Sequence, residues 1–155
     1  MDNVQLLTDL KNVAVPFNQQ EVNRRAQNDF RFVATKLNLM VANNVDLLAV
    51  HLNGRKICDV VAVPLITEKK VCQLPENLVK LDDPKMFVAV VCYEDDKPID
   101  VLMLDSEMFA HQMKFISRDK KAGAYVIKIK DIKHPAAQKH AFGLVISELT
   151  GGAAK

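Results

Sequence analysis

The chain has 155 residues, of which 49% are apolar and 26% are charged, and its formal net charge is only +2. This composition is typical of a globular protein and excludes a largely disordered chain. No apolar run approaches the length of a membrane span, and the first residues lack the basic and apolar regions of a signal peptide. We therefore expect a soluble, cytoplasmic protein without a membrane partner. It should form one domain over residues 1–150, followed by a flexible tail at 151–155.

Three cysteines, Cys58, Cys72 and Cys92, support a reducing compartment. Their number is odd and no two of them form a CxxC pair. Cys58 and Cys92 lie inside apolar runs, so the sequence predicts buried free thiols rather than disulfides. The four histidines show no spacing typical of zinc ligands.

Apolar residues at helical spacing predict two helices at the start of the chain. The first covers residues 3–13 and ends before Pro16. The second covers residues 18–38 and begins with Asn18 and Glu21 at the spacing of a capping box. It is expected to end near Asn38 and to pack on a flat surface through one apolar stripe, made of Val22, Ala26, Phe30, Val33 and Leu37.

The strongest local signal is Asn53-Gly54 between two apolar runs, which predicts a β-hairpin over residues 44–64. Pro64 is expected to end the second strand, because proline cannot donate to a strand ladder. The remaining elements are predicted as a strand at 39–42, a connection at 65–84, strands at 85–93 and 99–104, a short helix at 106–113, a strand at 124–130 and a helix at 135–149. This order predicts an α/β (α+β) fold, with a single mixed β-sheet flanked by helices.

The hairpin also predicts which side chains share a face. With a two-residue loop, Leu48 lies opposite Asp59 and Asp46 lies opposite Val61. Paired residues point to the same face of a sheet, so Asp46 and Asp59 become diagonal neighbours about 7–8 Å apart. Two carboxylates at that separation could share one divalent cation.

An amphipathic helix with an acid, followed by a hairpin with an acid in each strand, resembles the PD-(D/E)XK superfamily of restriction-endonuclease-like nucleases. The resemblance covers about residues 18–63. It implies a restriction-endonuclease-like fold, with Glu21, Asp46 and Asp59 as catalytic acids and with Asp46 and Asp59 as the ligands of Mg²⁺. The position of the family's catalytic Lys is Val61, and valine can neither orient a water molecule nor stabilise a phosphate.

Each acid also has a structural explanation. Glu21 can complete the capping box, and Asp46 can terminate the turn at residues 43–44. Asp59 in a half-buried strand needs a partner, either Lys36 from the helix or water at an edge strand.

Three functions follow from these alternatives. The first is a degenerate, non-catalytic nuclease-fold protein, a pseudoenzyme that binds DNA or a protein partner, including a second copy of itself. We favour it because of Val61. The second is an active Mg²⁺-dependent DNA endonuclease whose Lys has migrated to Lys36, Lys69 or Lys70. The third is an unrelated α/β protein-interaction module.

Charge is unevenly distributed along the chain. Residues 82–107 hold eight acids and two bases, whereas residues 111–140 hold eight bases and two acids. A basic region is the electrostatic signature of nucleic-acid binding, but solvated turns and helix faces also explain it, and we favour that explanation. The residues predicted to contact nucleic acid are Arg24, Arg25 and Arg31 on the second helix and Lys120 and Lys121 in the basic region.

Overall fold

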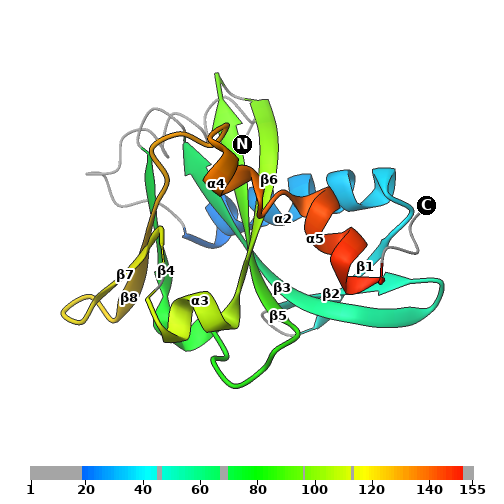
Figure 1. Ribbon diagram of the computed structural model, residues 1–155, viewed down its shortest axis with the longest axis horizontal. Coiled ribbons are helices and arrows are strands. Elements are labelled where there is room, and N and C mark those ends of the chain that lie inside the picture. The colour runs from blue at the N-terminus through cyan, green and yellow to red at the C-terminus, as the bar shows by residue number, and fades with distance from the viewer. Residues whose placement is uncertain (1–18, 45–46, 67–69, 96, 113, 152–155) are drawn as a thin grey trace.

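The computed structural model describes residues 19–44, 47–66, 70–95, 97–112 and 114–151, and the first predicted helix at 3–13 lies outside them (Figure 1). The fold is mixed α+β, which confirms the predicted class. No helix in the described ranges is both long and apolar enough to cross a membrane. In chain order the elements are α2 (Gln19–Lys36), β1 (Met40–Asn44), β2 (Leu47–Leu52), β3 (Arg55–Ile66), β4 (Val71–Pro75), the 3₁₀ turn η1 (Glu76–Leu78), β5 (Met86–Glu94), β6 (Lys97–Asp105), α3 (Ser106–Ala110), β7 (Ile116–Asp119), β8 (Ala124–Lys128), α4 (Pro135–Gln138) and α5 (Phe142–Leu149).

Two sheets organise the molecule. The larger has five strands in the order β1-β2-β3-β5-β6, and β3 and β5 are its one parallel pair. The smaller has three antiparallel strands in the order β4-β8-β7. The sequence analysis expected one sheet, because it treated residues 65–84 as a connection and recognised no strand at 116–119. Both missed strands are short and acquire their backbone partners only through β8.

The helix α2 has the predicted position. Ala26, Phe30 and Ala34 are fully buried along one stripe, at the spacing that brings residues to the same face of a helix. The helix ends at Lys36, two residues before Asn38, which has a φ of 61°, and the amide of Leu39 donates to the carbonyl of Ala34 at 3.1 Å. An asparagine in the left-handed region is a common helix end.

The predicted hairpin is present, but its register is not the predicted one. Asn53 and Gly54 have φ values of 54° and 80°, as a type I′ turn requires. Leu52 faces Arg55 as expected, and the register then shifts at a β-bulge next to His51. As a result Leu48 pairs with Val60 and not with Asp59.

Two other boundaries differ from the prediction. The strand β3 continues past Pro64 to Ile66. Its pairing with β2 ends at Val60, and beyond that residue it is paired with β5. The predicted last helix is two helices, since the segment before Phe142 leaves the helix to bond the edge of β6. There the carbonyl of His140 accepts from the amide of Met103 at 2.7 Å. Pro135 is in the first turn of α4, as expected.

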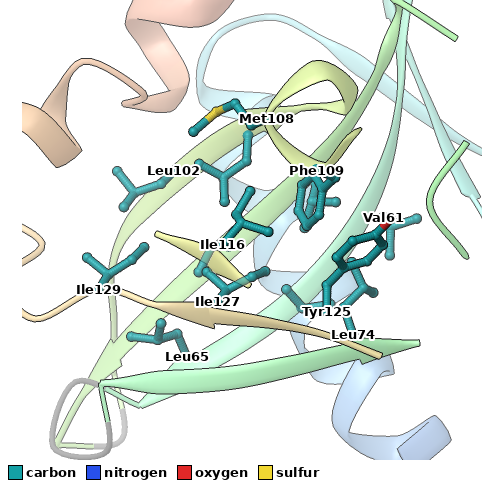
Figure 2. Close-up of a cluster of buried hydrophobic side chains, with 14 of the residues drawn as sticks. Val61, Leu65, Leu74, Leu102, Met108, Phe109, Ile116, Tyr125, Ile127 and Ile129 are labelled. Atoms are coloured by element: carbon teal, nitrogen blue, oxygen red, sulfur yellow. The ribbon is translucent and has the colours of Figure 1, made fainter. Parts of the chain in front are cut away.

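Apolar side chains form one core on each face of the five-stranded sheet. The helix-side cluster lies under α2 and α5, and the rings of Phe30 and Phe142 are 5.1 Å apart in it. The sheet-side cluster lies between the two sheets, and Figure 2 shows its side chains converging from both. The strand β5 is buried on both faces from Met86 to Tyr93, which confirms the prediction of a central strand.

Candidate functional site

Asp59 is the predicted acid that the structure describes most fully. Its side chain is 9% exposed, and its Oδ2 lies 3.0 Å from the Nζ of Lys56. Its Oδ1 is buried and accepts no hydrogen bond from any described residue. A buried carboxylate oxygen without a donor is costly, so this atom marks a position where stability is not optimised.

The bulge in β3 explains why Lys56 reaches Asp59. Residues three apart on a regular strand point to opposite faces. Ile57 is the extra residue of the bulge, because His51 pairs with Lys56 and the next residue, Val50, pairs with Cys58. Lys56 and Asp59 therefore share the sheet-side face. The sequence analysis missed Lys56, because the ideal hairpin register placed it on the other face.

The same shift removes the geometric basis for the predicted acid pair. Leu48 belongs to the helix-side cluster, whereas Val61, on the same side of β3 as Asp59, belongs to the sheet-side cluster. The prediction that Leu48 and Asp59 share a face is therefore wrong. Asp46 lies outside the described residues. Glu21 lies in α2, but its side chain is also outside them, so the roles of both acids remain predictions.

The predicted Lys partners of Asp59 are elsewhere in the described structure. Lys36 lies over the ring of Phe32 at 4.6 Å on α2, which covers the opposite face of the sheet. Lys70 bonds the carbonyl of Ile66 through its amide, and Ile66 is seven residues along β3 from Asp59, a distance of about 23 Å in a strand. Lys69 lies outside the described residues.

Val61 is buried in the sheet-side cluster (Figure 2), at 5% exposure. An ammonium group at this position would be surrounded by apolar side chains. The ammonium of Lys56, which is paired with Asp59, would also repel a cation at this carboxylate. No group of three potential metal ligands occurs among the residues that the structure describes, so Mg²⁺ binding by Asp46 and Asp59 stays a prediction.

The arginines predicted to form a nucleic-acid-binding face of α2 have different surroundings. Arg24 is exposed, but Arg25 is only 8% exposed, which leaves little of its side chain accessible to a nucleic acid. Its guanidinium lies 4.9 Å from the ring centroid of Tyr93 and 3.3 Å from Asp29. Arg31 donates to the carbonyl of Val41 at 3.5 Å and to the side chain of Asn43.

Asp29 is a partly buried carboxylate on the helix side, and two donors meet at its Oδ2. The hydroxyl of Tyr93 donates to it at 2.5 Å, and Nε of Arg25 is the second donor. Burial, and then the hydrogen bond to Asp29, raise the pKa of Tyr93 well above its ordinary value. The carboxylate of Asp29 is thus hydrogen-bonded and faces a positive charge, so we assign this polar cluster a structural role.

A hollow of about 350 Å³ gathers positive charge from the basic region of the sequence. We call it the basic hollow, and its lining residues are Lys114, Phe115, Lys128, Lys130, Asp131, His134 and Ala136. The side chains of all three lysines are exposed, and none has a carboxylate partner among the described residues. Asp131 is the only acid in the lining, and its Oδ1 accepts from the amide of Lys133 at 3.0 Å.

Local structure explains how the lysines meet. Ile127 and Ile129 are buried in the sheet-side cluster, so Lys128 points away from it by strand alternation. Lys130, beyond the end of β8, is also exposed. Lys114 arrives from the segment before β7, where the carbonyl of Phe115 accepts from the amide of Lys128 at 2.8 Å. The charge count of the sequence indicated this region, but not that these residues converge.

Lys120 and Lys121 lie at the other end of β8 from the basic hollow. Both are exposed in the turn between β7 and β8, and the amide of Lys121 donates to Asp119 at 3.1 Å. Their contact with nucleic acid stays a prediction.

The predicted apolar stripe of α2 is not buried to its end. Leu37 is 40% exposed and lines an apolar groove of about 390 Å³. The groove runs between α2, the edge strand β6 and α5, and Val33, Ile99 and Phe142 contribute to it. The exposed apolar surface is the feature of the described chain that best suits a protein partner.

All three cysteines are free thiols, as predicted. Burial raises the pKa of Cys58 and of Cys72 to about 12, and the neighbouring Asp59 adds to the effect at Cys58. Thiols with such pKa values are protonated at neutral pH and are poor nucleophiles. They belong to the packing of the two clusters.

Comparisons with protein-family models, with curated proteins and with solved structures find no match to this chain.

Proposed function

We propose that this protein binds nucleic acid through the basic hollow and does not cleave it, as a degenerate, non-catalytic relative of the PD-(D/E)XK nucleases would. One observation carries the binding proposal: Lys114, Lys128 and Lys130 line a single hollow without carboxylate partners. Like charges held close together repel one another, and a polyanion that enters the hollow relieves this repulsion.

The surroundings of Asp59 support the non-catalytic part of the proposal. Metal-dependent phosphodiester hydrolysis needs carboxylate oxygens that are free to hold the ion. One oxygen of Asp59 is already paired with Lys56, and Val61 is enclosed by apolar side chains. The nuclease relationship itself is supported by the sequence pattern and by the order helix, three-stranded meander and then a strand parallel to β3.

The binding test is fluorescence anisotropy with labelled single-stranded and duplex DNA at low salt, followed by a salt titration. The test variant replaces Lys114, Lys128 and Lys130 with Gln. The control variant makes the same change at Lys80, Lys85 and Lys97, which are also exposed but lie outside the hollow. We expect the test variant alone to bind weakly, with a log–log salt slope smaller in magnitude by about 2 to 3.

Three results would contradict the proposal. Absence of binding at low salt would exclude nucleic acid, and an equal loss in both variants would exclude the basic hollow as its site. Magnesium- or manganese-dependent cleavage by the wild-type protein would exclude the non-catalytic function, provided that Asp59→Ala abolishes it.

A protein partner is the second candidate, and the exposed apolar groove beside β6 is the observation that favours it. It becomes the better explanation if the protein does not bind nucleic acid at low salt.

A further inference from the structure

Phe115 is an unusual residue in the wall of the basic hollow. Its φ is 80°, in the left-handed region that bulky residues rarely adopt. Two contacts hold it there: its carbonyl accepts from the amide of Lys128 at 2.8 Å, and its ring meets the edge of the His140 ring, with centroids 6.2 Å apart. Backbone strain of this kind persists only where surrounding contacts enforce it, and it is concentrated at functional sites.

The ring of Phe115 is half-buried and forms part of the lining of the hollow. The Nζ of Lys114 lies 5.7 Å from the ring centroid, over one face of the ring. Lys114 is exposed, so its flexible side chain can leave this position. An aromatic face next to unpaired ammonium groups is the combination that proteins use to bind single-stranded nucleic acids.

We propose that the basic hollow binds single-stranded nucleic acid, with one base stacked on Phe115 and the adjoining phosphates on Lys128, Lys130 and Lys114. This inference rests on the proposed nucleic-acid function and names its ligand class. Stacking needs an aromatic face and tolerates any base, because every base has a π face. The site should therefore show little sequence preference.

The positions of the lysines suit an extended strand. Lys128 is the last residue of β8 and Lys130 follows two residues later, so their Cα atoms are at most about 7 Å apart. This separation is of the order of that between successive phosphates in an extended strand. When the base occupies the face of Phe115, the ammonium of Lys114 is displaced from it and is free to pair with a phosphate.

His134 supplies a further donor. Its Nδ1 accepts from the amide of Ala136 at 3.0 Å, so the neutral imidazole carries its proton on Nε2. The N–H at Nε2 is then left to donate to a phosphate or base oxygen. Asp131 disfavours an additional phosphate on its side of the hollow, which limits the site to a short stretch of strand.

A duplex does not meet the same requirements. Its bases are stacked on one another and cannot offer a face to Phe115. The hollow, at about 350 Å³, is also of the size that accommodates a small ligand rather than a double helix. A duplex can still contact the lysines through its phosphates, so it serves as the probe that separates charge from stacking.

The test compares three labelled probes of about 12 nucleotides, a length within the range of known single-strand sites. These are an oligothymidine, a strand of the same length and charge made of abasic units, and a duplex. Wild-type protein is expected to bind the oligothymidine about 5- to 150-fold more tightly than the abasic strand, which is the range for stacking one base.

Phe115→Leu is expected to reduce that ratio to about 1, because it keeps an apolar side chain but removes the ring. Phe115→Tyr retains the ring and should retain the ratio. The matched control is Phe32→Leu, because Phe32 also has a lysine over its ring but lies on α2, outside the hollow. Circular dichroism establishes that each variant is folded.

The possible outcomes separate the two proposals. Equal wild-type affinity for the oligothymidine and the abasic strand overturns the stacking inference, even if no Phe115 variant folds. An unchanged ratio in folded Phe115→Leu also overturns it, whereas the proposed function survives both results. Failure of all three probes to bind at low salt overturns the proposed function as well. Tighter binding of the duplex than of the oligothymidine would also contradict a site that selects an unstacked base.

Discussion

The two faces of the five-stranded sheet bury polar groups in different ways. On the helix side, the carboxylate of Asp29 has two donors, Tyr93 and Arg25. On the sheet side, one oxygen of Asp59 has no donor among the described residues. The strained Phe115 and the unpaired lysines also belong to the sheet-side half of the molecule. Unsatisfied groups and strain tend to occur where function opposes stability. The comparison therefore favours the sheet side as the functional half and the helix side as the scaffold.

The largest expected effect tests the scaffold. Phe30 is fully buried and its ring packs against Phe142, so Phe30→Ala removes a ring from the helix-side cluster. We expect a loss of about 3–5 kcal/mol in the free energy of unfolding, measured by denaturant titration. Phe32→Ala, at a position 61% exposed, should change it by no more than about 0.5 kcal/mol. A loss below about 1 kcal/mol for Phe30→Ala would contradict the role of this helix.

An intermediate effect is expected at the pair on the sheet side. Lys56→Met leaves the buried carboxylate of Asp59 without its cation, which should cost about 1–3 kcal/mol of unfolding free energy. The double change Lys56→Met with Asp59→Leu removes the carboxylate too, and most of that loss should be recovered.

Lys85→Met is the matched control, because Lys85 is exposed and has no carboxylate partner among the described residues. A stability of Lys56→Met equal to that of the control variant would show that Lys56 does not stabilise the carboxylate of Asp59 in solution.

The smallest effect is a pH dependence at His140, which borders Phe115. Burial lowers the pKa of His140 below its ordinary value of 6.5, and the nearby Asp105 and Glu148 partly offset this by raising it. The folded state therefore binds fewer protons than the unfolded state just below pH 6.5. The stabilising contribution is complete above that pH and is lost as the pH falls through the folded pKa.

The measurement compares the unfolding free energies of wild type and His140→Gln between pH 7.5 and pH 5. The wild type should lose more stability than the variant over this interval, so their difference should narrow or change sign on acidification. Parallel curves would show that His140 titrates alike in both states. The other histidines are common to both proteins and do not affect the comparison.

Local patterns in the sequence were sufficient for most single elements. The helix α2, the Asn53-Gly54 turn, the doubly buried strand β5 and the alternation of β8 all follow from periods of 3.6 or 2 and from turn residues. Asp105 precedes α3 and caps it, because its side chain accepts from the amide of Met108 at 3.0 Å. These features depend on neighbours within a few positions, which is why they can be recognised without a structure.

The candidate sites could not be predicted in the same way. One extra residue at Ile57 reverses the face of Asp59 relative to Leu48, and a bulge has no clear signal in an apolar run. The partner of Asp59 is therefore Lys56 and not the predicted Lys36 of the helix. A shift of one residue exchanges every side chain between faces, so the predicted acid pair depended on a register that the turn alone did not determine.

The amino-acid pattern alone was thus enough to determine the fold class, the free thiols and the presence of a basic region. Only the tertiary structure decided that the strands divide into two sheets, that Arg25 is buried while Lys114, Lys128 and Lys130 are not, and that Phe115 lies among these lysines. The physical reason is the range of the interactions. Helix and turn preferences act between residues a few positions apart, whereas the pairing of β8 with β4, which builds the second sheet, joins segments about 50 residues apart.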